Sequence, residues 1–257
     1  MDLKGKTVLV TGASSGIGEA CARAFAEKGS NLLLTARRKE VLEKLAAEIK
    51  ETYSVPVDVF QFDVCNRKAV FAFAEELAAK KIVPDVLINN AGLARGLSKL
   101  HEGNVDEWEE MIDTNVKGLL YVSRAILPMM VARNYGHVVN IGSLAGRIVY
   151  PSGNVYCASK AAVDALNQAM NLDLVGTNIR ATLIEPGTVK TNFSVVRFSG
   201  DQARADAVYD GLRYLTAEDI AATVLYVVQA PDKINIQSIL VVPIDQRSPY
   251  VVHREKK

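Results

Sequence analysis

Three residues in the middle of the chain have types and a spacing suited to proton transfer. Tyr156 and Lys160 are four positions apart, and Ser143 precedes the tyrosine by thirteen residues. On a helix, residues four apart share a face, so both side chains can act on one bound molecule. A free tyrosine, with a pKa of about 10, is a poor base at neutral pH, and a nearby ammonium lowers that pKa. The pattern predicts that Tyr156 exchanges the proton and that Lys160 adjusts its pKa.

The reaction that suits these residues is reversible hydride transfer. In alcohol oxidation Tyr156 would take the hydroxyl proton while a hydride leaves the carbon, and in carbonyl reduction it would return the proton. Ser143 would donate a hydrogen bond to the reacting oxygen and stabilise the charge that develops there. Taken singly, each residue has a structural alternative: Ser143 could cap a turn and Tyr156 could pack on a sheet.

The elements that must position these residues follow from hydrophobic periodicity. Short apolar, β-branched runs predict strands, and they occur at residues 7–10, 31–35, 57–62, 86–89, 137–141, 179–184 and 239–242. Amphipathic stretches of helical period alternate with them, at residues 16–28, 40–51, 68–80, 105–133 and 155–175. This alternation predicts an α/β fold, a single doubly wound Rossmann-type domain over residues 1–257 with a roughly seven-stranded parallel sheet and helices on both faces. Ligands bind such sheets at the carboxyl ends of the strands.

A glycine-rich turn follows the first predicted strand, with the sequence TGASSGIG at residues 11–18. Gly12, Gly16 and Gly18 would allow a tight turn, close backbone approach and packing of the next helix. The N-terminus of that helix would attract a pyrophosphate. The predicted cofactor contacts therefore include Ser14, Ser15 and Ile17. The alternative is a simple strand-to-helix turn.

The end of the second strand favours NADP over NAD. No acidic residue stands there to bind a ribose 2′-hydroxyl, and Arg37 and Arg38 follow instead, which suits a 2′-phosphate. These arginines could also simply begin a solvated helix. Asp63, at the end of the third strand, could bind the adenine amino group or cap the next helix.

Together these features resemble the short-chain dehydrogenase/reductase family. The resemblance covers nearly the whole chain and rests on residues 11–18, NNAG at 89–92, Asn115, Ser143 and the YCASK segment at 156–160. It implies that Lys160 also holds the nicotinamide ribose, beside Tyr156, and that Asn115 supports a water-linked proton relay to Lys160. It further implies a homo-oligomer, either a dimer or a tetramer.

Two further segments would line the cofactor. The small residues that close the fourth strand let the backbone approach the adenosine side, which predicts contacts from Asn89, Ala91 and Gly92. By family resemblance, the segment after the sixth strand lies near the nicotinamide carboxamide, and its predicted contacts are Pro186, Gly187, Thr188, Val189 and Thr191.

Within that family, residues 91–97, 217–228 and 234–243 resemble the NADP-dependent 3-hydroxy acid dehydrogenases, which oxidise serine, allo-threonine and related small acids. A carboxylate substrate requires a cation, because a charge moved out of water needs a partner. Arg147, four residues after Ser143, and Arg95 are the candidates. The enzymatic alternative is a 3-oxoacyl carrier-protein reductase or another small-carbonyl reductase. A catalytically silent NADP-sensing protein is disfavoured, because it would be expected to have lost Tyr156 or Lys160.

Composition restricts the remaining possibilities. Thirty Lys and Arg residues against 29 Asp and Glu give a net charge of +1, which gives no support to a nucleic-acid or membrane partner and leaves a small-molecule substrate. Three cysteines without a CxxC pair argue against a zinc site and a disulfide framework, so a cytoplasmic setting and no metal are expected. Residues 187–215 lack periodicity and predict a substrate lid. The charged end, from about 246 to 257, predicts a solvated tail.

Overall fold

Strands and helices alternate along the chain in the computed structural model, which describes residues 1–255. Seven parallel strands form one sheet in the order β3-β2-β1-β4-β5-β6-β7. Their bounds are β1 Thr7–Thr11, β2 Asn31–Ala36, β3 Val57–Gln61, β4 Val86–Asn89, β5 Gly136–Ile141, β6 Ile179–Pro186 and β7 Ser238–Val241. The predicted fold class is confirmed, and every predicted strand occurs within a few residues of its expected place.

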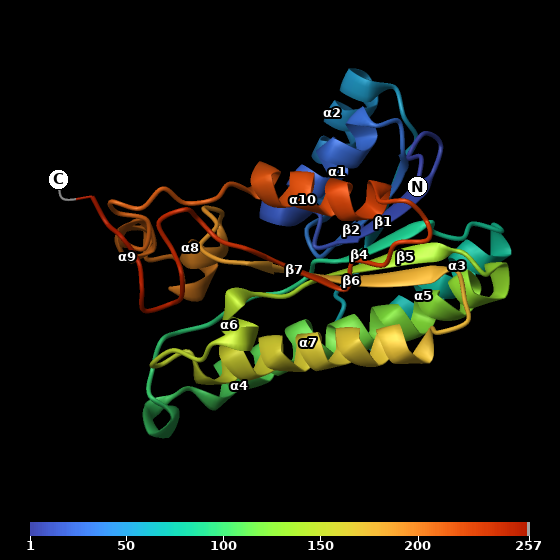
Figure 1. The fold of residues 1–257 in the computed structure, drawn as a ribbon. Coiled ribbons are helices and arrows are strands. Elements are labelled where there is room, and N and C mark those ends of the chain that lie inside the picture. Colours follow the sequence, from blue (N-terminus) through green and yellow to red (C-terminus); the bar gives the residue numbers. More distant parts are fainter. Residues whose placement is uncertain (256–257) are drawn as a thin grey trace.

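Helices cover both faces of this sheet (Figure 1). One face carries α1 Gly16–Glu27, α2 Lys39–Tyr53 and α10 Ala217–Gln229, and the other carries α3 Arg67–Ala79, α4 Val105–Ile112, α5 Leu119–Arg133 and α7 Asn154–Asp173. The central strands β4, β5 and β6 are buried at every position, which explains why their sequences do not alternate between apolar and polar residues.

The predicted helix over residues 105–133 is not continuous. A π-helical turn, Asp113–Gly118, separates α4 from α5. Such turns insert one extra residue into the helical ladder and often occur at functional sites. Here the turn carries Asn115 and buries its side chain.

The strand order reverses at β1. The chain passes from β1 to β2 and β3 on one side and then returns to β4 on the other, which leaves a crevice at the carboxyl ends of β1 and β4. The glycine-rich turn follows β1 and residues 90–92 follow β4, so the two predicted cofactor segments meet there.

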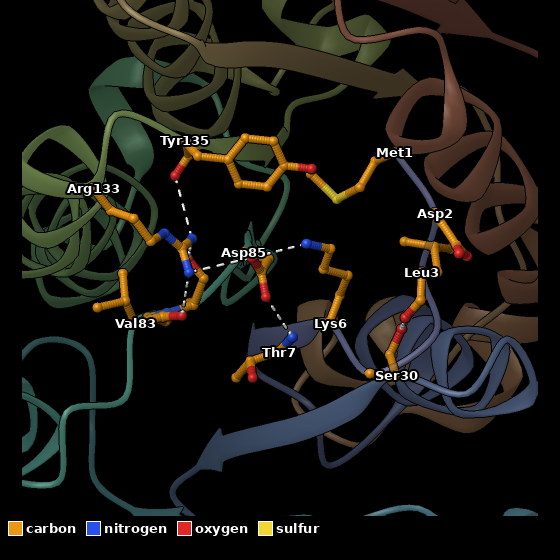
Figure 2. Close-up of polar contacts among 12 residues, drawn as sticks. Met1, Asp2, Leu3, Lys6, Thr7, Ser30, Val83, Asp85, Arg133 and Tyr135 are labelled. Atoms are coloured by element: carbon orange, nitrogen blue, oxygen red, sulfur yellow. Dashed lines mark hydrogen bonds and ion pairs between the residues drawn. The ribbon is translucent and has the colours of Figure 1, made fainter.

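An ionic cluster around Asp85 lies at the amino ends of β1 and β4, away from the crevice (Figure 2). Asp85, which is 8% exposed, accepts a hydrogen bond from the backbone N–H of Thr7 at 2.8 Å. Its other carboxylate oxygen lies 3.2 Å from Nη1 of Arg133 and 3.8 Å from Nζ of Lys6. The cluster ties β1 to the segment before β4 and to the end of α5, far from the crevice.

Residues 187–215 contain more structure than their sequence predicts. Two short helices, α8 Phe193–Arg197 and α9 Gln202–Ala207, lie beyond the carboxyl ends of the strands (Figure 1). The short helix α6 Leu144–Arg147 lies in the same region of the molecule.

Most residues from 246 to 255, the segment predicted to be a solvated tail, are exposed, but hydrogen bonds hold this segment to the rest of the chain. Gln246 is 6% exposed, and its side chain accepts a hydrogen bond from the N–H of Thr188. The N–H of Glu255 donates to the carbonyl of Gly211 at 2.8 Å, and Arg254 donates to carbonyls in the same segment. The tail is held because its polar groups find partners in residues 187–215. Residues 256 and 257 lie outside the described part of the chain.

Candidate active site

The turn after β1 is shaped for close contact with a phosphate. Gly12 has φ +64°, in the left-handed region that favours glycine. A Cβ on Gly18 would lie 2.4 Å from the carbonyl oxygen of Gly12, so only glycine fits where α1 packs on the turn. Ser15 precedes α1 without a capping hydrogen bond from its side chain, which leaves the first N–H groups of the helix free to face an anion.

One cavity of about 830 Å³ extends from this turn across the crevice. Most of the predicted cofactor residues line it, namely Gly12, Ser14, Ser15, Gly16, Ile17, Arg37, Arg38, Asp63, Ala91, Gly92, Pro186, Gly187, Thr188, Val189 and Thr191. Ser143, Tyr156 and Lys160 line the same cavity. The residues present therefore fit a dinucleotide whose phosphates face α1 and whose reactive end faces Tyr156.

The adenosine end of the cavity is positively charged. Nη2 of Arg38 donates to Oγ of Ser14 at 3.0 Å, which places the guanidinium over the glycine-rich turn. Arg37 lies 3.8 Å from the carboxylate of Asp63, and both side chains are more than a third exposed. This end can therefore hold an additional phosphate.

Ser143 and Tyr156 are brought together by two helix starts. Ser143 is the N-cap of α6, and its Oγ accepts a hydrogen bond from the N–H of Ala145 at 3.1 Å. Tyr156 lies in the first turn of α7 and is 8% exposed, and the Ser143 hydroxyl opposes the rise in its pKa that burial causes, so the two hydroxyl groups lie close together. The predicted capping role of Ser143 and its place at the reacting oxygen are compatible, because the cap fixes the direction of the hydroxyl.

The electrostatics of Tyr156 differ from the sequence-based expectation. Burial raises the pKa of Tyr156 to about 12, and the groups that oppose this rise are the Ser143 hydroxyl and the positive charge of Arg197. Lys160, which was expected to lower this pKa, donates from Nζ to the carbonyl of Ile141 at 2.9 Å. Burial also lowers the pKa of Lys160 to about 8. Tyr156 is therefore protonated at neutral pH in this arrangement.

Asn115 lies behind the cavity wall. Its side chain donates to the carbonyl of Leu93 at 2.8 Å and to Oγ of Ser159 at 3.0 Å, and it accepts from the N–H of Leu93 at 2.8 Å. These bonds join the π-helical turn to the segment after β4 and to α7. A Cβ on Gly92 would meet Oδ1 of Asn115 at 3.1 Å and Nζ of Lys160 at 3.5 Å, so Asn115 and Lys160 approach the same glycine.

One predicted cofactor residue is replaced by its neighbour. Asn89 does not line the cavity, because its amide donates to Ser123 and Asn140 within the core. Asn90 lines the cavity instead, and its amide donates to the carbonyls of Thr11 and Gly12.

The two arginines predicted to bind a substrate carboxylate are already paired. Arg147 forms a two-pronged ion pair with Glu185, whose side chain is 1% exposed, and it does not line the cavity. Arg95 lines the cavity, but its guanidinium pairs with Glu110 at 2.6 Å. Each guanidinium therefore already has a protein carboxylate as its partner, and of the two only Arg95 faces the cavity.

The reactive end of the cavity also contains residues that sequence reasoning missed. Tyr150, Phe193 and Arg197 line it, and Phe193 packs against the ring of Tyr156 at 5.6 Å between centroids. Phe193 and Arg197 lie in residues 187–215, the segment predicted to be a lid, and that prediction was the only sequence signal that pointed to them.

Within residues 1–255, no group of three or more His, Cys, Asp or Glu side chains is arranged to hold a metal, and no helix is long and apolar enough to cross a membrane.

The parallel sheet, the glycine-rich turn and the Ser143, Tyr156 and Lys160 arrangement define a nucleotide-dependent oxidoreductase. The family model described as short chain dehydrogenase matches residues 6–201, and the chain belongs to that family.

Three known proteins are similar to this chain over nearly its whole length. The chain is 47% identical over 240 residues to an NADP-dependent 3-hydroxy acid dehydrogenase of Salmonella typhi, covering 93% of this chain and 95% of the relative. It is 41% identical over 250 residues to sulfoacetaldehyde reductase 2 of Chromohalobacter salexigens, covering 96% and 98%. The solved closed form of a serine dehydrogenase complexed with NADP⁺ superimposes with a TM-score of 0.90 at 43% identity, covering 97% of this chain and 100% of that one.

Proposed function

We propose that this protein is an NADP-dependent dehydrogenase that transfers a hydride between the cofactor and a small 3-hydroxy acid, such as serine or allo-threonine, or its carbonyl product. The observation that carries the proposal is the continuous cavity, which joins the uncapped start of α1 to the hydroxyl groups of Ser143 and Tyr156. The names of the relatives support the substrate class and the cofactor.

The roles of the residues follow from their geometry. When bound, the nicotinamide ring would accept or supply the hydride. Ser143, oriented by the N–H of Ala145, would donate to the substrate oxygen, and Tyr156 would exchange the hydroxyl proton. Lys160 would hold the nicotinamide ribose, and Asn115 would position Lys160 and a proton relay through its contacts with Leu93 and Ser159.

Selection of NADP is assigned to Arg38 and to its neighbour Arg37, which are both exposed. A guanidinium suits a phosphate because it offers several N–H donors with a fixed charge. Replacing Arg38 with Leu should raise the KM for NADP at least about tenfold, the size of one charge-assisted hydrogen bond, with little change in the KM for NAD. Equal losses with both cofactors would contradict the assignment.

The substrate class is tested by a spectrophotometric panel. NADPH formation should be followed with serine, the threonine stereoisomers, 3-hydroxybutyrate and simple alcohols, with NAD in parallel. We expect the 3-hydroxy acids to give the highest kcat/KM and Tyr156→Phe to abolish turnover. Turnover restricted to neutral alcohols, or to acyl thioesters of a carrier protein, would refute the proposed substrate class.

A reductase acting on an anionic aldehyde is the second candidate. It is favoured by the 41% identity to a sulfoacetaldehyde reductase, because a sulfonate and a carboxylate present similar negative oxygens to the same cations. NADPH oxidation with sulfoacetaldehyde, measured beside the 3-hydroxy acid panel, separates the two candidates.

Assembly and setting are part of the proposal. We expect a homo-oligomer, a dimer or a tetramer. One supporting feature is the edge strand β7, where Leu240 is 40% exposed, together with the segment after it, where Ile244 is 63% exposed. Size-exclusion chromatography with light scattering, on the wild type and Leu240→Glu, tests this.

The free thiols of Cys21, Cys65 and Cys157 suit a reducing compartment such as the cytoplasm. We further propose that residues 187–215 act as a lid over bound substrate.

A further inference from the structure

Arg197 stands at the reactive end of the cavity. It is the last residue of α8, in the segment proposed as a lid, and it lines the same cavity as Ser143 and Tyr156. Its guanidinium lies 5.3 Å from the ring centroid of Tyr156 and 5.6 Å from that of Tyr150. A cation at this place is next to the atoms that exchange the proton.

The guanidinium is held in place without being neutralised. Nε donates to the carbonyl of Gly96 at 3.2 Å, and Nη2 donates to the hydroxyl of Tyr150 at 2.8 Å. The backbone of Arg197 also accepts a hydrogen bond from the N–H of Gly96 at 3.0 Å. Within residues 1–255, no carboxylate pairs with Arg197 and no acceptor faces its Nη1.

Arg95 contributes to this placement. Its Nη1 donates to the carbonyl of Val196 at 2.7 Å, while its other nitrogens bind Glu110. The Arg95 and Glu110 pair therefore anchors the end of α8, which carries Arg197. Arg95, which is predicted from the sequence to bind substrate, thus also helps to hold Arg197 in place through the carbonyl of Val196.

The surrounding charge leaves room for an anion. Among the described residues that line the cavity, Asp63 is the only acidic one, and it lies beside Arg37 at the adenosine end. A carboxylate that leaves water needs a charged or strongly donating partner, and a guanidinium with unused N–H groups supplies both.

We propose that Arg197 binds the carboxylate of the substrate and thereby selects 3-hydroxy acids over neutral alcohols; this inference rests on the proposed function. In a 3-hydroxy acid the carboxylate carbon is two carbon–carbon bonds from the carbon that bears the hydroxyl. An acid whose hydroxyl group is hydrogen-bonded to Ser143 and Tyr156 can therefore place its carboxylate at the neighbouring guanidinium of Arg197. Because Arg197 belongs to α8, the same contact would hold the lid segment over the substrate.

The test compares an acid with its neutral ester. We would measure kcat/KM for 3-hydroxybutyrate and for its methyl ester with wild type, Arg197→Leu, Arg197→Lys and Arg204→Leu. Arg204 is the matched control, because it is an exposed arginine on α9 of the same segment that stacks on Phe198 and does not line the cavity. Loss of a charge-assisted pair predicts that Arg197→Leu lowers kcat/KM for the acid by about 100-fold relative to the ester. Arg197→Lys should keep part of the preference for the acid, and Arg204→Leu should keep all of it.

The ratio of the two substrates separates this role from a general effect on Tyr156. The charge of Arg197 lowers the pKa of Tyr156, so its removal slows oxidation of the acid and of the ester together. Only recognition of the carboxylate changes the ratio. If Arg197→Leu is poorly folded, competitive inhibition by propionate against the ester, measured with wild type and Arg197→Lys, gives an independent reading. Propionate should inhibit the wild type and should inhibit Arg197→Lys less strongly.

The outcomes separate the role of Arg197 from the proposed substrate class. A wild type that prefers the acid, together with an Arg197→Leu variant that keeps the preference, overturns the role of Arg197 and leaves the proposed function intact. A wild type that oxidises the ester as well as the acid, or no 3-hydroxy acid at all, rejects the proposed substrate class. Inhibition by propionate that is equal in wild type and Arg197→Lys also counts against the role of Arg197.

Discussion

Replacing Arg147 with Met tests whether this arginine stabilises the fold or binds substrate. Arg147 is four residues from Ser143, a spacing that suggests contact with substrate, yet in the structure Nε donates to both carboxylate oxygens of Glu185 at 2.7 and 2.8 Å. Nη2 also donates to Oγ of Ser238 at 3.1 Å. The pair joins α6, which begins just after Ser143, to the end of β6.

The expected loss of stability follows from burial. Glu185 is 1% exposed, and removing one partner of a buried ion pair costs about 3 to 5 kcal/mol because the other charge remains buried. The side chain of Arg147 is 42% exposed, so water can partly replace it, which favours the lower end, about 3 kcal/mol. For a chain of this length that corresponds to a fall in Tm of about 6 to 12 °C.

The assay combines thermal unfolding at fixed protein concentration with the acid and ester kinetics. Arg147→Met should melt earlier but keep the ratio of kcat/KM between 3-hydroxybutyrate and its ester. The double variant Arg147→Met with Glu185→Leu should recover most of the lost stability, because no uncompensated charge remains. A variant with unchanged Tm that no longer prefers the acid would refute this reasoning and return Arg147 to the substrate site.

Three further predictions concern other parts of the molecule. Burial raises the pKa of Tyr156 to about 12, and alcohol oxidation needs the phenolate, so the rate of oxidation should rise about tenfold per pH unit between about pH 7 and 9. Carbonyl reduction uses the protonated tyrosine, so its rate should stay nearly constant over the same range. An oxidation rate independent of pH would contradict the role of Tyr156. Asp85→Asn should lower the free energy of unfolding by about 1 to 2 kcal/mol, since Lys6 and Arg133 lose their counter-charge, and Asp85→Ala should lower it further, since the N–H of Thr7 loses its acceptor. Urea unfolding measures both, and a change in kcat for either would conflict with the distance of this cluster from the crevice. Arg180→Met should cost about 2 to 4 kcal/mol in the same assay, because this buried guanidinium donates to carbonyls at and beyond the end of α10, including those of Val228 and Ala230; a wild-type midpoint would show that water replaces it.

Local sequence patterns are enough to predict the fold class and the candidate catalytic residues. Strands buried on both faces are rich in apolar residues without polar alternation, and the helices between them are amphipathic, so this alternation of patterns predicts the parallel sheet. Gly18 is dictated locally, because any Cβ there would collide with the turn that begins α1. The four-residue spacing of Tyr156 and Lys160 likewise depends only on the geometry of one helix.

Which polar side chains face the cavity depends on contacts between residues far apart in the chain. Arg147 meets a carboxylate 38 positions away in the chain and Arg95 meets one 15 positions away, and no local spacing reveals those partners. Arg197 faces Tyr156 because α8 folds back over the carboxyl ends of the strands, a placement fixed by contacts with Gly96 and Tyr150, about 101 and 47 positions away. Local sequence patterns specify elements through short-range sterics, whereas the charge left over for a ligand depends on which long-range pairs form. Which cation faces the substrate end of the cavity is therefore a property of the folded chain.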